Sequence, residues 1–301
     1  MRVQAEDRVT SKWPEVMEDW KRAWYRLRRS TVSLIGLGIV IGLILMAIFA
    51  PFLAPYPEDA GSVVKFKEAH LPPGQAHWFG TDEVGRDILS RVIYGSRISL
   101  VLGFAVLTLA LVVGVPLGLI AGYWGGRVNT VIMRLTDIFL AIPPTVLALA
   151  VSSALAPNLT NSMIAVSFGW WPWFTRLVQG EVLSVKEEQF VEASRSLGAS
   201  RFRIIFKDIL PNVLSPIIVK ATLDMGFVIL IGASLSFLGL GAQPPTPAWG
   251  TMIAEGRIYL PESWWVATFP GLAIFVTVLG FNLLGDGLRD VFDVDLDRWS
   301  G

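Results

Sequence analysis

The chain has 301 residues, of which 53% are hydrophobic and 17% charged, and its mean hydropathy is +0.55. Soluble domains carry roughly 25% charged residues, and here the shortfall is concentrated in long uncharged runs, which excludes a soluble globular fold and indicates a polytopic membrane protein. A net formal charge of zero argues against nucleic acid as a partner. The absence of cysteine excludes disulfides, thiolate metal sites and a cysteine nucleophile.

The N-terminal segment, residues 1–32, is predicted to be cytoplasmic and amphipathic. It carries eight Lys and Arg, and Trp13, Trp20 and Trp24 lie among these charges. Such a mixture of aromatic and basic residues is typical of a helix that lies on a membrane surface. The uncharged run that follows, residues 33–52, is longer than the core of a cleavable signal and predicts a retained first span.

The segment at residues 53–97 is too long for a simple turn, and we expect it to form a small extracytoplasmic cap. Its final part, residues 86–97, is predicted to be helical because its aliphatic residues fall on one side of a helix. The cap holds both histidines of the chain. They lack the H-E-x-x-H spacing of a zinc site, so no metal site is expected.

Residues 98–290 are predicted to hold the five remaining spans, because each uncharged run approaches the ~20 residues that cross a ~30 Å hydrocarbon core. Pro143 and Pro144 predict a kink or a late start in the second of these runs. The third run is short, and we assign it as a span because the topology of its neighbours requires one. The five predicted spans are residues 98–122, 138–157, 161–175, 213–240 and 264–285.

The expected fold is therefore all-α, a polytopic membrane bundle of six transmembrane helices with the cap between helices one and two. Lys and Arg are concentrated in the N-terminal segment, in the loops after the second and fourth spans and at the C-terminal end, where residues 291–301 form a predicted tail. The positive-inside rule then puts both termini in the cytoplasm.

The loop at residues 181–211 is the most informative segment of the chain. The residues before Gly198 are predicted to form a helix that this glycine ends in the left-handed conformation, and Ser200 is predicted to cap a second helix. Pro211 is expected to stop or kink that helix before the fifth span. A helix pair of this kind can transmit a push because it moves as a body. On the residues alone, a solvated connector is an equally good interpretation.

Several motifs of the chain resemble those of permease subunits in ATP-driven bacterial importers. The run from Glu192 through Gly198 to Ile209-Leu210-Pro211 resembles their E-A-A-x-x-x-G…I-L-P loop. Three further segments resemble the C-type permease of the dipeptide, oligopeptide and nickel importer family, in the same order along the chain. They are H-W-F-G-T-D-x-x-G-R-D at residues 77–87, S-L-S-F-L-G-L-G with P-P-T-P-A-W-G at residues 234–250, and N-L-L-G-D-G-L-R-D at residues 282–290.

The resemblance implies the type I fold of ABC importer permeases, a bacterial inner-membrane location and transport of a short peptide. The implied partners are a second permease, two cytoplasmic ATP-binding subunits and an extracytoplasmic substrate-binding protein. ATP and Mg²⁺ would be held by the ATP-binding subunits, so the chain itself would bind no cofactor and be no enzyme. The substrate within the family, whether dipeptide, oligopeptide, glutathione or nickel chelate, stays open. The residues implied to contact an ATPase are Glu192, Ala193, Ser194, Leu197, Gly198, Arg201, Ile209 and Pro211.

Three polar residues in or beside the spans, Asp137, Asp224 and Asn282, are candidates for lining a translocation path. A charge at the bilayer centre costs at least ~2.5–3.5 kcal/mol on insertion scales, so Asp224 should face protein or water. Lys220 lies one helical turn before Asp224, at a spacing that allows the two to pair. The sequence leaves open whether Asp224 lines the path or only locks helices together through this pair.

Gly114, Gly118 and Gly122 repeat the four-residue spacing of small residues that lets two helices approach closely. This pattern favours a packing seam on the second span. A hinge within a gate is the alternative.

Two other function classes compete with the importer. An ion-gradient-driven secondary transporter or channel would use Asp137 and Asp224 as proton or cation sites and would work without an ATPase. A membrane scaffold would not transport at all. The chain has no G-x-x-x-x-G-K-[ST] motif, so any ATP must be bound by another subunit, and no catalytic residue is predicted.

Overall fold

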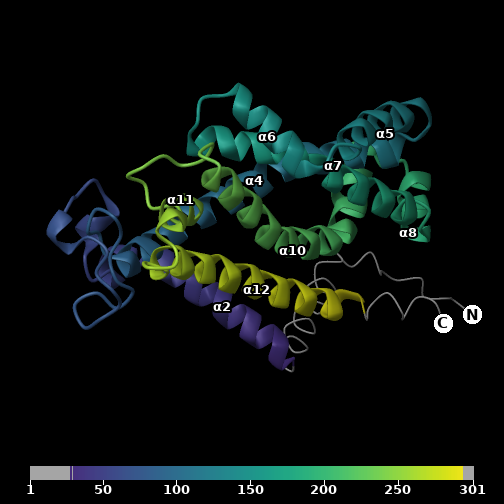
Figure 1. Cartoon of the computed structure of the whole chain (residues 1–301). Helices are drawn as coiled ribbons and strands as arrows, with labels where there is room; N and C mark the ends of the chain where they lie inside the picture. The colour runs from purple at the N-terminus through teal and green to yellow at the C-terminus, as the bar shows by residue number, and fades with distance from the viewer. Residues whose placement is uncertain (1–27, 29, 294–301) are drawn as a thin grey trace, which may run out of the picture.

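The computed structural model describes residue 28 and residues 30–293, and the regular elements there are helices packed into a bundle (Figure 1). Most of the predicted N-terminal segment, with its surface helix, and most of the predicted tail lie outside the described residues. Four helical runs are long and apolar enough to cross a membrane, and each overlaps a predicted span. They are α2 (Thr31–Ile48), α4 (Ile88–Trp124), the run Arg201–Phe237 that ends in α10 (Leu210–Phe237), and α12 (Trp265–Asp293).

The predicted third span is a bent pair of helices, α5 (Gly126–Leu140) and α6 (Pro144–Ala154), which are inclined to each other by 83°. The kink expected at Pro143 and Pro144 is present, because proline has no N–H and the residue before a proline disfavours helical backbone. The sequence prediction missed most of α5, because charged residues are spread along it. Asp137 therefore lies near the end of α5.

The helix at the predicted fourth span, α7 (Leu159–Val185), is long enough to cross a membrane but not apolar enough to be recognised as a span by composition. It carries Arg176, Gln179 and Glu181. Because α4, α6 and α10 all pack against it, most of its surface faces protein and not lipid. Within residues 30–293 the structure thus supports four spans, or five with the bent pair counted as one, where the sequence predicted six.

The helix of the second span, α4, starts earlier than the predicted span and reaches into the cap. The helix predicted within residues 86–97 is confirmed from Ile88 onward, and it continues into the membrane-spanning part without a break. Its first turn is capped by Asp87, whose Oδ2 accepts a hydrogen bond from the Ser90 N–H at 2.8 Å. The cap is therefore built directly on the end of a spanning helix.

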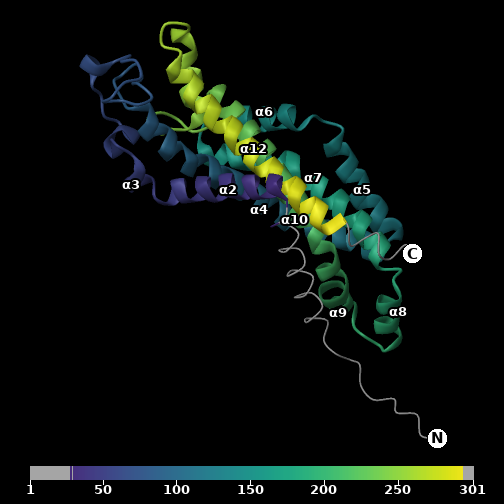
Figure 2. The same cartoon turned by 90° about the horizontal axis from the view of Figure 1, so that it is seen from below.

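The cap and the loop at residues 181–211 lie at opposite ends of the bundle, and α2 runs beside α12 (Figures 1 and 2). The remaining elements belong to these ends. They are α3 (Ala50–Leu53), η1 (Pro57–Ala60) and η2 (Phe66–Glu68) in the cap, α8 (Gln189–Ser196), α9 (Arg201–Arg203) and the π-helical η3 (Ile204–Ile209) in the loop, and α11 (Trp249–Gly256) and η4 (Arg257–Tyr259) between α10 and α12.

The most extensive packing in the bundle joins α4 to α7 along the three regularly spaced glycines of α4, which we call the glycine seam. A Cβ atom added to Gly118 would lie 2.6 Å from the Cβ of Val178, and one added to Gly122 would lie 2.6 Å from the Cβ of Val182. A Cβ atom added to Gly114 would lie 2.7 Å from the Cβ of Phe174. The packing interpretation of this repeat is confirmed, since any side chain there would force the helices apart.

We predict that Gly118→Ala destabilises the protein and that Gly271→Ala does not. Both glycines are helical, but a Cβ at Gly271 of α12 meets nothing within 4 Å. Overpacking costs about 1–3 kcal/mol, whereas alanine alone favours a helix over glycine by about 1 kcal/mol. Thermal unfolding of the detergent-solubilised protein measures the difference. Equal melting temperatures for the two variants would contradict the seam.

Candidate functional site

The loop at residues 181–211 folds as a helix, a tight turn and a second helix. After α8, Gly198 has φ of +77°, a conformation in which a side chain would strain the backbone. The Ser200 Oγ accepts a hydrogen bond from the Arg203 N–H at 3.4 Å and caps the next helix. The predicted helix, left-handed glycine and serine cap are all confirmed.

The second helix of the loop does not end before the fifth span. In η3 the winding widens, and the Leu210 N–H donates to the carbonyl of Ile205, five residues earlier. The wider turn accommodates Pro211, which has no N–H and would crowd the carbonyl four residues before it in an α-helix. One helical run therefore continues from Arg201 to Phe237. Of the stop or kink expected at Pro211, the stop does not occur, because the chain changes its helical winding there without ending the helix.

One face of the loop is buried against α7. Val191, Ile204 and Ile209 are almost fully buried and belong to one apolar cluster with Val178 and Val182. These two valines are also the residues that the seam glycines approach most closely. Burial of each aliphatic side chain contributes about 1.5–3 kcal/mol. The loop is thus fixed to the glycine seam through side chains that the two contacts share.

The opposite face of the loop is exposed. It includes Glu192, Ala193, Leu197, Gly198, Arg201 and Pro211, which are six of the eight residues predicted to contact an ATPase; Ser194 is half-buried and Ile209 lies in the cluster.

Sequence reasoning missed two exposed aromatic residues of this face, Phe202 and Phe206. Their rings are parallel, with centroids 6.4 Å apart, and Leu197 nearby in the chain is 87% exposed. The sequence pattern that could have identified them is their four-residue spacing among basic residues, which places both rings on one side of a helix. Together Leu197, Phe202 and Phe206 form what we call the apolar tip, a feature typical of a surface that another protein covers.

Asp224 and Lys220 form the predicted pair, at the middle of α10. The Lys220 Nζ lies 3.0 Å from Oδ2 and 3.1 Å from Oδ1 of Asp224. From α7, the Trp170 Nε1 donates to Asp224 Oδ2 at 3.1 Å. The ammonium also lies 5.6 Å from the ring centroid of Trp173 and 5.8 Å from that of Phe174. The pair therefore links the centres of α10 and α7.

The other two path candidates lie apart from this pair. Asp137 of α5 forms an ion pair with Arg176 of α7, and the two side chains are 47% and 48% exposed. Beside them the Gln179 Nε2 donates to Asn129 Oδ1 at 3.3 Å, so the contact between α5 and α7 is polar. Asn282 is half-buried on α12, and no hydrogen bond among the described residues joins it to either aspartate. The three candidates occupy three helices and do not form one site.

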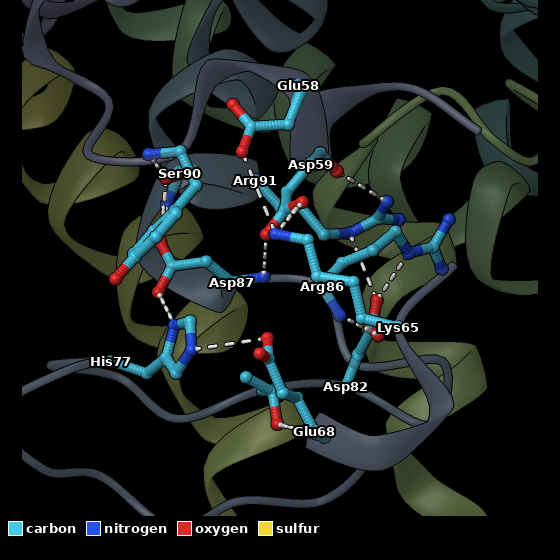
Figure 3. Close-up of polar contacts among 12 residues, drawn as sticks. Glu58, Asp59, Lys65, Glu68, His77, Asp82, Arg86, Asp87, Ser90 and Arg91 are labelled. Carbon is cyan, nitrogen blue, oxygen red and sulfur yellow. Dashed lines mark hydrogen bonds and ion pairs between the residues drawn. The ribbon is translucent and has the colours of Figure 1, made fainter. Parts of the chain in front are cut away.

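A network of buried charges stabilises the cap (Figure 3). Asp59 and Asp82 are at most 3% exposed. The Lys65 Nζ lies 2.8 Å from Asp59 Oδ1, and the Arg86 Nε lies 2.7 Å from Asp82 Oδ2. Buried charges are tolerated only when paired in this way.

Asp87 joins this network to the start of α4. Its N–H donates to Asp59 Oδ2 at 2.9 Å, while its own Oδ1 lies 2.9 Å from the His77 Nδ1 (Figure 3). Its Oδ2 accepts from the Ser90 hydroxyl at 2.7 Å. His77 is thus a packing and hydrogen-bonding residue of the cap.

Arg91 ties the cap to α11, which lies some 160 residues later in the chain. Its side chain is 1% exposed, with Nε 3.5 Å from Asp82 Oδ2 and Nη2 3.9 Å from Glu255 Oε2. On the same surface the Trp249 Nε1 donates to the carbonyl of Val92 at 2.9 Å. The cap, the start of α4 and α11 therefore form one packed unit.

Comparison with known proteins agrees with the resemblance to importer permeases, both in the families that match and in the individual relatives. Residues 114–298 match the family described as "Binding-protein-dependent transport system inner membrane component", and residues 19–73 match the N-terminal transmembrane domain of oligopeptide transport permease C. The chain is 45% identical over 290 residues to the dipeptide transport system permease protein DppC of Alkalihalophilus pseudofirmus, covering 96% of this chain and 92% of that protein. It is 46% identical over 279 residues to the glutathione transport system permease protein GsiD of Escherichia coli, covering 93% and 91%.

Among solved structures, the inward-facing methionine ABC transporter MetNI contains a chain of the same fold. The TM-score is 0.56 at 20% sequence identity, and the match covers 68% of this chain and 97% of that one. About a third of this chain lies outside the match.

We predict that Arg91→Met destabilises the cap strongly, while Arg97→Met, an exposed position on the same helix, does not. Removal of one partner from a buried charge network costs about 3–5 kcal/mol because the other charges remain buried. Thermal unfolding and limited proteolysis of the cap measure this loss. Equal stability of the two variants would show that Arg91 is not the link.

The Arg91→Met variant should regain part of its stability as the pH is lowered. Burial, reinforced by Glu83, raises the pKa of Glu255, and Arg91 opposes this rise. A carboxyl whose pKa is higher in the folded protein than its ordinary 4.5 favours folding when protonated, so lowering the pH through the raised pKa stabilises the fold. Melting temperatures of Arg91→Met and Arg97→Met across that range test this, and a gap that stays constant would contradict it.

Proposed function

The chain belongs to the family of inner membrane components of binding-protein-dependent transport systems, and we propose that it forms half of the translocation path of an ATP-driven importer for short peptides. It is a multi-pass inner membrane protein and a permease subunit that catalyses no reaction itself. Systems of this family comprise ATP-binding subunits and a substrate-binding protein, so the energy for transport comes from partner chains.

One observation carries the coupling role of the loop at residues 181–211. The loop has an exposed face with Glu192, Arg201 and the apolar tip, and a buried face packed on α7. A soluble partner that grips the exposed face therefore moves helices that cross the membrane. A solvated connector, the alternative interpretation, needs neither an apolar tip nor a buried face.

We assign α7 as the sixth span and both termini to the cytoplasm. With 27 residues at ~1.5 Å each, α7 is long enough to cross the ~30 Å hydrocarbon core. Its enclosure by α4, α6 and α10 explains why its sequence is less apolar than that of a lipid-facing helix. With six spans, the basic loops fall on one side, in agreement with the positive-inside rule.

The translocation path is proposed to run along the exposed stripe of α7 beside α5 and α10. This stripe holds Phe168, Trp173, Arg176 and Gly180, while the rest of the helix is mostly buried. A half-exposed ion pair such as Arg176 with Asp137 is costly against lipid, so it should face water or a protein partner. A second permease packed across this stripe would enclose the path.

The proposed substrate is a short peptide. The similar proteins include transport permeases named for dipeptides, for di- and tripeptides and for glutathione, which are all short peptides. A soluble binding protein would select among them and dock at the extracytoplasmic end. The cap, with its internally paired charges, supplies a preformed surface there (Figure 3).

The mechanism is alternating access driven from the cytoplasm. ATP binding closes the two ATP-binding subunits, which move the loop by its exposed face. The buried face passes this movement to α7, and the glycine seam passes it to α4. Because the cap is built on α4, the same helix connects the driven end with the end where substrate arrives.

An ion-gradient-driven transporter is the second candidate, and the geometry argues against it. Its proposed cation sites, Asp137 and Asp224, are each already paired, with Arg176 and Lys220. A carboxylate that is already paired with a neighbouring cation is a poor site for a metal cation. Transport by the purified chain in liposomes without an ATPase would nevertheless establish this alternative.

We predict that Glu192→Lys and Gly198→Asp uncouple ATP hydrolysis from transport. The first reverses a charge on the exposed face, and the second strains the turn at φ of +77°. In the reconstituted complex, peptide uptake should fall about tenfold, the effect of losing one charge-assisted contact, while ATPase activity persists. Asp290→Lys, an exposed charge reversal on α12, is the control. Normal peptide uptake by both loop variants would contradict the proposed coupling role of the loop.

The ATP-binding subunits should co-purify with the chain and be lost when residues 186–207 are replaced by a glycine-serine linker. The replaced residues include the whole exposed face except Pro211, and α7 and α10 are left intact. Retention of the subunits by the replaced chain would place the main docking surface elsewhere.

A further inference from the structure

The pair of Lys220 and Asp224 presents its positive end to the exposed side of the bundle. The Asp224 residue is 8% exposed, whereas the Lys220 side chain is 27% exposed. Both oxygens of Asp224 are engaged, by Lys220 and by the Trp170 indole N–H. An ammonium has three N–H donors, and Asp224 occupies one side of it. The carboxylate is therefore fixed in place, and the cation keeps capacity for a further acceptor.

Lys220 lies on α10, and the residues of α7 around it suit an anion that is attached to an apolar group. The ammonium lies 5.6 Å from the ring centroid of Trp173, which is 43% exposed. Arg176 lies three residues further along the same exposed stripe, paired in turn with Asp137. Lys220 beside this stripe and Arg176 on it are thus two cations, each held by its own carboxylate, along the proposed translocation path.

The pair of Lys220 and Asp224 lies near the middle of the helices that it joins. Asp224 lies at the middle of α10, and its partner Trp170 lies near the middle of α7. At the centre of a span a charged pair that served packing alone could be fully buried, yet here the lysine remains partly open. The open cation, fixed by Asp224 and flanked by Trp173, offers a preformed contact for a carboxylate.

We propose that Lys220 anchors a carboxylate-binding subsite halfway along the translocation path, which takes the C-terminal carboxylate of a peptide in transit. Trp173 supplies the apolar wall for the adjoining residue of the peptide, and Asp224 positions the ammonium. This subsite rests on the proposed importer function. The competing interpretation is a structural pair that only locks α7 to α10.

The chain has no cysteine, which permits a direct test in the assembled complex. In Trp173→Cys, the rate of modification is measured with an anionic sulfonate methanethiosulfonate and with a cationic trimethylammonium one, by mass spectrometry of this chain. Lys220→Gln should lower the anionic-to-cationic rate ratio about fivefold or more, and Asp224→Asn should raise it. Lys220→Arg, which keeps the charge, should leave the ratio near its starting value.

Because Lys220→Gln alone leaves Asp224 unpaired, the double variant Lys220→Gln with Asp224→Asn supplies a neutral, hydrogen-bonding pair. In the Trp173→Cys protein, this double variant should also have a lower anionic-to-cationic rate ratio than Trp173→Cys alone, since the exposed cation is gone. Alanyl-alanine should protect the cysteine from modification more than alanyl-alanine amide does, and this difference should vanish in the double variant.

Two results would overturn the subsite: no modification by either reagent, or a rate ratio that Lys220→Gln and the double variant leave unchanged. ATP-driven peptide uptake by the unmodified complex is measured in parallel. Uptake without charge-dependent modification removes only the subsite, whereas absence of uptake removes the importer function on which it rests.

Discussion

The close approach of α4 and α7 is the contact on which the rest of the structure depends. At the glycine seam, a single added carbon at Gly118 would overlap Val178, so the two helices behave as one body. Val178 and Val182 then turn their remaining surface to Ile204 and Ile209 of the loop. A loop that would otherwise be a flexible connector is thereby fixed to the helices that cross the membrane. The coupling that we propose therefore rests on packing and needs no charge relay.

The opposite end of the bundle is held by a different kind of interaction. Charges dominate the cap, and the buried Arg91 connects it to α11. Trp265 of α12 also donates its indole N–H to the carbonyl of Thr81 at 3.1 Å, so α4, α11 and α12 meet at the cap. The bundle is therefore held by buried charges at the cap and by apolar packing at the loop, with a polar middle near Lys220. This division matches what an alternating-access permease requires of one subunit.

The sequence was informative where local rules decide the outcome. Lipid-facing helices must be apolar, which located α2, α4, α10 and α12, and the left-handed turn at Gly198 follows from glycine itself. The sequence was less informative where contacts with other parts of the fold decide the outcome. The polarity of α7 reflects its contacts with α4, α6 and α10. Nothing local to Arg91 indicates its partner Glu255, which a distant segment brings to the cap.

The most direct test of this account is whether the loop and α7 move together. Spin labels on cysteines introduced at Arg195 and Gly180, both exposed, report the distance from α8 to α7 in the assembled complex, and a pair at Arg195 and Asp290 reports the distance from α8 to α12. Between the nucleotide-free and ATP-bound states, the first distance should stay constant while the second changes. A first distance that changes as much as the second would mean that the loop slides on α7 and that the seam does not transmit its movement.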